Sequence, residues 1–174
     1  MAKDVDDLLK WLPSIALFGG LQEPTLRRVI AMLGEHRFEP GSNVCKQGDS
    51  GRALFLVRSG EVLVYRDGED GRRIKMVRMG VGEFFGEMTL IDVQKRSATV
   101  VVEQSALLFS LGNRDLYTLY QEDVPGYVMI LQNLARELSR RLRVTNQRLQ
   151  SLAAEQDEDD RTLIRPAVTR AKPI

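Results

Sequence analysis

The chain has 174 residues, of which 43% are hydrophobic and 28% are charged, and its formal net charge is +1. This length and composition are typical of one globular domain with a real core. The near-neutral charge provides no overall field toward nucleic acid or a membrane. A single cysteine excludes an intrachain disulfide framework. The acidic start lacks the apolar segment of a signal peptide, and no run reaches transmembrane length, so we expect a cytoplasmic protein.

Residues 1–34 are predicted to form an N-terminal helical segment. Glu23-Pro24 is a favourable start for its second helix, because proline fits the first helical turn. Apolar residues share one face in each expected helix: Leu8, Leu9 and Leu12, then Leu26, Val29, Ile30 and Leu33.

Between residues 35 and 111 the apolar period changes from helical to strand-like. Seven short pieces alternate in this way: His36–Phe38, Val44–Lys46, Ala53–Ser59, Glu61–Arg66, Arg72–Arg78, Thr99–Val102 and Ala106–Ser110. Turn pairs such as Pro40-Gly41 and Asp67-Gly68 separate them. Short strands at this density predict a β-sandwich or barrel.

Residues 112–154 are predicted to form a helix pair. A short helix ends near Glu122, Asp123-Val124-Pro125 interrupts it, and a long helix follows from about Gly126 to Ala154. Its apolar seam alternates spacings of three and four: Val128, Leu131, Ala135, Leu138, Leu142, Thr145, Leu149 and Leu152. Such a seam indicates a parallel homodimer through residues 126–154, in which the polar Thr145 fixes the register. The tail, residues 155–174, is acidic and then basic with prolines, and we expect it to be disordered.

Residues 85–100, FGEMTLIDVQKRSATV, carry the strongest chemical signal. A glycine before a short helix leaves backbone N–H groups that favour an anion, and a nearby arginine can hold two phosphate oxygens. An ionised carboxylate can only accept hydrogen bonds, so Glu87 is suited to a sugar hydroxyl instead. Taken singly, these residues are usually structural; together they indicate a nucleotide.

This segment resembles the phosphate-binding cassette of the cyclic nucleotide-binding domain family. The family includes bacterial catabolite activator proteins and the regulatory subunits of cyclic-nucleotide-dependent kinases. The residues that fit its pattern are Phe85, Gly86, Glu87, Met88, Leu90, Ile91, Arg96, Ser97, Ala98, Thr99 and Val100. The resemblance implies an α+β, mainly β fold: an eight-stranded jelly-roll β-barrel with N-terminal helices and a long C-terminal dimerisation helix.

The resemblance also implies ligand contacts within the cassette. Gly86 and Glu87 would offer amides to the ligand, with Met88 beside them, and Glu87 would bind the ribose 2′-hydroxyl. Arg96 would pair with the cyclic phosphate, and Ser97 would add a further bond to it. Thr89 departs from the family, which usually has alanine or glycine there. Its β-branched side chain could crowd the phosphate or donate its own hydroxyl.

The run RRLRVTNQRLQSLA is similar to the dimerisation helix of the catabolite activator proteins. By that resemblance, Thr145 would bond the exocyclic amine of adenine, and Asn146 would reach the nucleotide held by the other subunit. Arg141 would pair with Glu87 and so link helix and pocket. The arginines around residue 141 are interspersed with glutamates, which favours a solvated face over a nucleic-acid patch.

Two function classes find little support in the sequence. Only 22 residues (174 − 152) follow Leu152, too few for a helix-turn-helix domain, so we expect no DNA binding from this chain alone. His36 and Cys45 are the only histidine and cysteine, which leaves no catalytic set and no metal cluster. We therefore expect neither an enzyme nor a metalloprotein.

The leading hypothesis is a cAMP-responsive regulatory module that dimerises through its long helix and signals to an unidentified downstream protein. Two alternatives stay open: the sensory part of a DNA-binding transcription regulator, and a scaffold of the same fold that binds no nucleotide. The ligand could also be cGMP, because a hydroxyl beside the cassette arginine, here Ser97, is sometimes used for guanine in the family.

Overall fold

The computed structural model describes residues 4–68, 70–91 and 95–163. The chain divides into two compact units, Met1–Leu134 and Ala135–Ile174. The first unit contains the sheet and most of the helices, and the second is the continuation of the last helix. We describe each unit by itself.

Three helical elements precede the sheet: α1 (Val5–Trp11), the 3₁₀ helix η1 (Leu12–Ser14) and α2 (Glu23–Met32). The Asp4 carboxylate caps α1 by accepting from the Asp7 N–H at 3.0 Å. α2 begins at Glu23 with proline in its first turn, where the sequence predicts it. The apolar faces of these helices are buried, so the segment belongs to the folded core.

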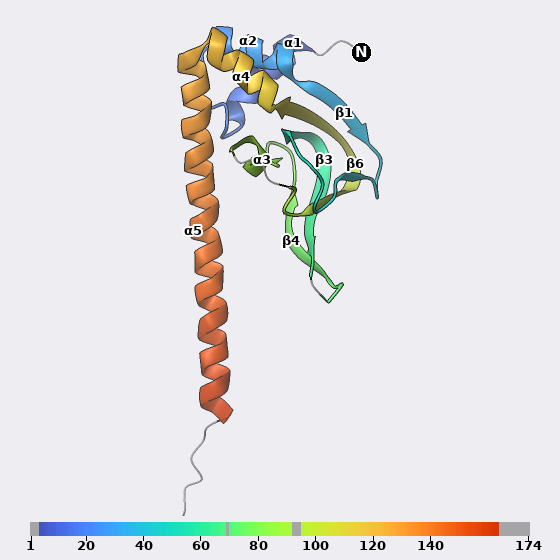
Figure 1. Cartoon of the computed structure of the whole chain (residues 1–174), viewed down its shortest axis with the longest axis vertical. Helices are drawn as coiled ribbons and strands as arrows, with labels where there is room; N and C mark the ends of the chain where they lie inside the picture. The colour runs from blue at the N-terminus through green and yellow to red at the C-terminus, as the bar shows by residue number, and fades with distance from the viewer. Residues whose placement is uncertain (1–3, 69, 92–94, 164–174) are drawn as a thin grey trace, which may run out of the picture. The chain divides into compact units, whose positions relative to one another are not determined.

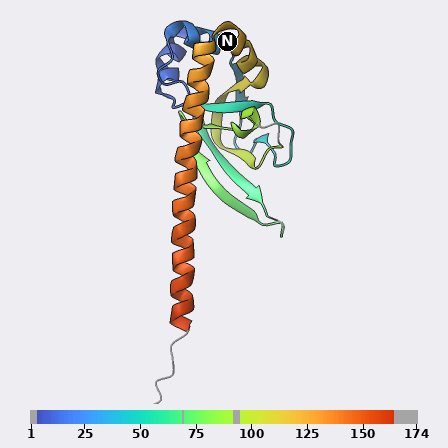
Figure 2. The same ribbon diagram turned by 60° about the vertical axis from the view of Figure 1, so that its left-hand side comes forward.

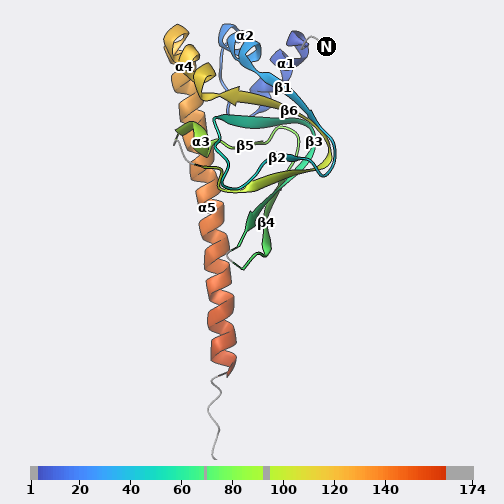
Figure 3. The same cartoon turned by 45° about the vertical axis from the view of Figure 1, so that its right-hand side comes forward.

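The sheet is antiparallel in the strand order β1-β6-β3-β4, with β2 paired to β6 and β5 paired to β3. Its strands are β1 (Gly34–Phe38), β2 (Asn43–Cys45), β3 (Ala53–Asp67), β4 (Arg73–Met79), β5 (Phe84–Phe85) and β6 (Thr99–Gly112). The sheet is strongly curled, as Figure 3 shows, and its buried side chains form an apolar core. That core includes Val57, Val62, Met79, Phe85, Val100, Val102 and Leu108. The hydrogen-bonded order has β1 and β4 at its ends, so the described strands do not close a ring.

The described residues form six strands, where the family resemblance predicts eight. The difference arises because β3 and β6 bend instead of breaking. The β3–β6 register shifts between Val57 and Val62, around Gly60. Gly60 has a φ of +82°, a left-handed conformation in which a side chain would also meet the backbone of Ser105. A glycine expected to separate two strands thus bends a continuous one.

The β3–β4 hairpin extends beyond the rest of the sheet (Figure 2). β4 is an edge strand, and most of its side chains are exposed, including the apolar Ile74 and Met76. Charged residues alternate with them, with Arg73 and Lys75 beside Ile74. Basic side chains on an edge strand discourage pairing with another sheet.

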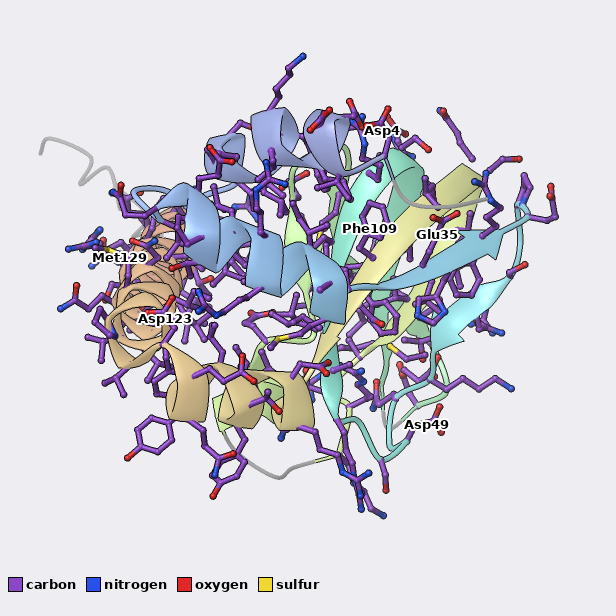
Figure 4. All side chains as sticks on the ribbon, turned by 90° about the horizontal axis from the view of Figure 1, so that it is seen from above. Asp4, Glu35, Asp49, Phe109, Asp123 and Met129 are labelled. Atoms are coloured by element: carbon purple, nitrogen blue, oxygen red, sulfur yellow. The ribbon has the colours of Figure 1, made fainter. Side chains whose placement is uncertain are left out.

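Two helices follow the sheet: α4 (Asn113–Glu122) and α5 (Val124–Leu163). Figure 1 shows α1, α2 and α4 at one end of the sheet, and Figure 4 shows α2 between α1 and α4. Asp123 separates α4 from α5, at the predicted break. Its carboxylate accepts from the Gly126 N–H at 3.0 Å and from the Thr25 hydroxyl of α2, and these bonds hold the pKa of Asp123 below its usual value.

α5 continues to Leu163, beyond the end predicted near Ala154, so part of the segment expected to be disordered is helical. The physical reason is that no glycine or proline lies between Gly126 and Pro166, and an acidic run alone does not end a helix. Residues 164–174 lie outside the described part of the chain. Across the described ranges, no helix has the length and apolarity to span a membrane.

Candidate functional site

The cassette predicted from the sequence lies between β5 and β6. β5 pairs with β3 through Phe55 and Phe85, and the four-residue helix α3 (Met88–Ile91) follows two residues later. Gly86, between them, has a φ of +80°, a conformation that strongly favours glycine. The Leu90 N–H bonds the Glu87 carbonyl at 2.9 Å, which closes the turn into α3.

Arg96 is a buried cation at the centre of the cassette. Its Nη2 donates to the Ala53 carbonyl at 2.7 Å, and its Nη1 lies 3.4 Å from the Gly86 carbonyl oxygen, to which it donates. The guanidinium lies 5.7 Å from the centre of the Phe55 ring. Burial of a cation is costly unless polar groups surround it, so the fold keeps this positive charge in a fixed place beside Gly86.

The backbone of Arg96 is held as firmly as its side chain. Its N–H donates to the Asp49 carbonyl at 2.7 Å, and its own carbonyl accepts from the Gly48 N–H at 2.9 Å. An isolated bridge pairs Ser50 with Lys95 in the same stretch. The loop before β3 therefore anchors the cassette arginine, a role that the sequence analysis missed. Backbone carbonyls and bridges leave no signature in residue types, so no local pattern could have revealed it.

The other predicted cassette residues differ in exposure. Glu87 is buried, with 7% of its surface exposed. Ser97 and Met88 are exposed, and the Ser97 Oγ lies 4.0 Å from the Met88 Sδ. Thr89 lies within α3, but its side chain is outside the described part of the chain. The structure thus brings together four of the predicted residues: Gly86, Met88, Arg96 and Ser97. The buried Glu87 lies between Gly86 and Met88 in the chain.

Cys45 shares this region of the sheet. It is partly buried, packs against the apolar core and lies 4.0 Å from the Ala98 carbonyl oxygen. Burial raises the pKa of its thiol, and the positive charge of Arg96 offsets only part of that rise. These contacts are typical of cysteine used as a small apolar residue.

The predicted residues of the long helix belong to the second unit. The Thr145 hydroxyl donates to the Arg141 carbonyl at 2.9 Å, and Asn146 is exposed. Arg141 donates from Nε to Glu137 at 2.8 Å, and Arg140 bonds the same carboxylate at 2.8 and 2.7 Å. These arginines lower the pKa of Glu137 to about 2. Glu137 is not among the predicted residues, although its spacing of three and four residues from the two arginines is a recognisable helix signal.

A separate hollow of about 500 Å³ lies within the first unit. Its lining residues are Leu90, Asn113, Leu116, Tyr117, Tyr120, Tyr127, Leu131 and Leu134. None of them is charged at neutral pH, so this hollow offers no cation for a phosphate.

No group of three or more histidine, cysteine or acidic side chains within the described ranges could hold a metal ion.

Comparison with known proteins gives the family. The family model "Cyclic nucleotide-binding domain" matches residues 35–123. The Cyclic AMP receptor protein of Thermus thermophilus is 34% identical over 140 residues, which cover 80% of this chain and 63% of that protein. The chain therefore belongs to the cyclic nucleotide-binding domain family, and it spans less than two thirds of that relative's length.

Solved structures support the same conclusion. The crystal structure of Thermus thermophilus Catabolite Activator Protein matches with a TM-score of 0.71 and 33% identity, over 79% of this chain and 63% of that one. The regulatory domain of Toxoplasma gondii PKA, in a co-crystal structure with cAMP, matches with a TM-score of 0.63 and 28% identity, over 68% of this chain and 46% of that one. These matches confirm the predicted family and the predicted mainly β fold with a long C-terminal helix.

Proposed function

We propose that this chain is a sensor module that binds a cyclic nucleotide, preferably cAMP, and passes the signal to a partner through α5. The observation that carries the proposal is the buried Arg96, fixed beside the left-handed Gly86 in the cassette of a family member. The relatives support it, because one is a cAMP receptor and another was crystallised with cAMP. The role is one of binding, so no covalent step is assigned to any residue.

In this proposal each part of the nucleotide meets a group of suitable chemistry. Arg96 pairs with the cyclic phosphate, because a guanidinium forms two parallel bonds to phosphate oxygens. Ser97 and the amide of Gly86 add donors to the same phosphate. The Glu87 carboxylate accepts from the ribose 2′-hydroxyl. Met88 and Thr89, at the start of α3, flank the ligand.

The second part of the proposal concerns α5. Leu142, Leu149 and Leu152 of the seam are each more than half exposed, and exposed apolar residues at coiled-coil spacing fit a second copy of the same helix. In the dimer, Thr145 would bond the adenine amine and Asn146 would reach the nucleotide of the other subunit. A ligand that contacts the helix can favour one of two helix packings, which a downstream protein would then detect.

Calorimetric titration of the full chain with cAMP, and separately with cGMP, tests the proposal. We expect saturable binding near one nucleotide per chain, tighter for cAMP. Arg96→Ala should reduce affinity about 100-fold or more, because a charge-assisted bond is worth about 1.5–3 kcal/mol and the phosphate would lose its cation. Arg72→Ala is the matched control, since it removes the same charge from an exposed hairpin position. Equal binding by wild type and Arg96→Ala would refute the proposed pocket.

Two other functions make different predictions, one in the same titration and one in a gel-shift experiment. A ligand-independent scaffold would give no heat with either nucleotide and a dimer of unchanged stability. The sensory part of a DNA-binding regulator would bind nucleotide, and promoter DNA would shift in a gel only with a longer protein. The second case draws on the finding that the chain spans 63% of the Thermus receptor.

A further inference from the structure

Gly51 faces the guanidinium of Arg96 at very short range. A Cβ built on Gly51 would overlap the Arg96 Nε, and it would lie 2.7 Å from Cζ and 2.9 Å from Cδ. Real Cβ atoms essentially never come that close to another heavy atom. The only space for a side chain at position 51 is therefore already filled by Arg96.

The backbone conformation of Gly51 does not explain this glycine. Seven glycines have a positive φ, among them Gly60 and Gly86, but Gly51 is not one of them. An alanine could thus adopt the backbone of Gly51 without left-handed strain. What demands glycine at this position is the space beside it.

The backbones of Gly51 and Arg96 lie in hydrogen-bonded segments, which oppose a movement that would make room for a methyl group. On one side, Ser50 pairs with Lys95, and the Arg52 carbonyl accepts from the Asn113 N–H at 2.9 Å. On the other side, the N–H and carbonyl of Arg96 are bonded to Asp49 and Gly48. The part that must give way is the guanidinium, and a shift would disturb its 2.7 Å bond to the Ala53 carbonyl.

We propose that Gly51 is a positioning residue for Arg96: by having no side chain, it lets the guanidinium lie where it can pair with the phosphate of the nucleotide. This inference rests on the proposed function, in which Arg96 binds that phosphate. Gly51 itself contacts no part of the ligand in this scheme. Its effect on affinity passes entirely through the arginine.

The test compares cAMP affinity in the full chain for wild type, Gly51→Ala and Gly80→Ala. Gly80 is a matched control, because its φ is also not positive and nothing lies within 4 Å of a Cβ built there. Gly51→Ala should weaken cAMP binding about 10- to 100-fold, the effect of one misplaced charge-assisted bond. Gly80→Ala should stay within about twofold of wild type. Wild-type affinity in Gly51→Ala would overturn the inference.

A second measurement separates this inference from the proposed function. Urea unfolding without nucleotide compares Gly51→Ala in the wild-type and Arg96→Ala backgrounds. Gly51→Ala should lower the unfolding midpoint only where Arg96 is present. In the Arg96→Ala background, the short alanine side chain at position 96 leaves room for the methyl group at position 51. Should wild type bind no cyclic nucleotide, the proposed function fails, and this coupling still decides whether Gly51 positions Arg96. An equal shift in both backgrounds would overturn that relation.

Discussion

The curled sheet and the part of α5 that forms the second unit place their leucines in opposite environments. Leu56 and Leu108 in the sheet are fully buried, whereas Leu142 and Leu149 on α5 are 60% and 59% exposed. The sheet completes its core within one chain. The helix has apolar residues at regular spacing whose burial requires another surface. The sheet is therefore built to hold a fixed shape, whereas the exposed leucines of the helix fit the proposed dimer.

Polar groups show the same contrast. In the cassette, the side chain of Arg96 donates to backbone carbonyls, and its backbone is hydrogen-bonded to the loop before β3. On α5, Glu137 is bonded by side chains of its own helix one turn away. The first arrangement depends on residues far apart in the sequence, and the second is local.

The largest expected effect comes from a matched pair of leucine truncations, which compares the free energy of unfolding in the two regions. Leu108→Ala should lower the free energy of unfolding by about 2–5 kcal/mol, because it removes buried methyl groups and leaves a cavity. Leu149→Ala should change it by less than about 0.5 kcal/mol in dilute protein. Urea unfolding with circular dichroism measures both. Similar losses would mean that α5 is packed as tightly as the sheet.

A charge in the seam should have the next largest effect. Leu142→Glu should weaken dimerisation about 100-fold, since it places a carboxylate in the apolar helix interface. Val144→Glu is the control, because Val144 lies on the same helix outside the seam. Sedimentation equilibrium over a range of concentrations measures the dissociation constant. A wild-type chain that stays monomeric at high concentration would remove the helix from the role proposed for it.

The pKa of Glu137 predicts a smaller, acid-dependent effect. The arginines lower this pKa from 4.5 to about 2. The ion pairs therefore contribute stability that is fully present above pH 4.5 and is lost as the pH falls toward 2. Because Arg140 is largely exposed, we expect only about 1–2 kcal/mol at neutral pH.

Glu137→Gln tests that expectation. Thermal unfolding of the variant should show less dependence on pH between 4.5 and 2 than thermal unfolding of wild type, and a lower midpoint at pH 7. The resonance of the Glu137 carboxyl carbon reports the pKa directly. An apparent pKa near 4.5 in that titration would contradict the local ion pairs.

The smallest effect is expected at Thr145. Its hydroxyl donates to the helix backbone, and in the proposed complex it bonds the adenine amine. Thr145→Val keeps the shape and removes the hydroxyl, so cAMP affinity should fall about 2- to 10-fold, the worth of one neutral hydrogen bond. Binding of cGMP, which lacks that amine, should not fall with it. An equal loss for both nucleotides would remove Thr145 from base recognition.

Much of this architecture could be predicted because it depends on local periodicity. The start of α2 at Glu23 follows from proline chemistry, and the helical seam from spacing alone. The bends in β3 and β6 could not be predicted, because Gly60 has the same sequence signature in a turn as in a bend. α5 extends beyond the end predicted near Ala154, because an acidic run does not stop a helix and no glycine or proline lies between Gly126 and Pro166.

The candidate site divides in the same way. Arg96 could be identified from the cassette because its neighbours are close in sequence. The roles of Gly51 and the Ala53 carbonyl could not be predicted, because both lie more than 40 positions before Arg96 in the chain and only the fold brings them next to it. Glu137 was within reach of sequence reasoning, since its partners lie three and four residues away.

The half-buried Cys45 has a practical consequence for studying the helix. Maleimides and methanethiosulfonates react with thiolate, and the raised pKa of this thiol keeps little of it ionised at neutral pH. A cysteine introduced at an exposed α5 position such as Gln150 would therefore be modified well before the native one. In the proposed dimer, a spin label attached there would report the distance between the two helices with and without nucleotide, while the only natural sulfhydryl of the chain is left in place.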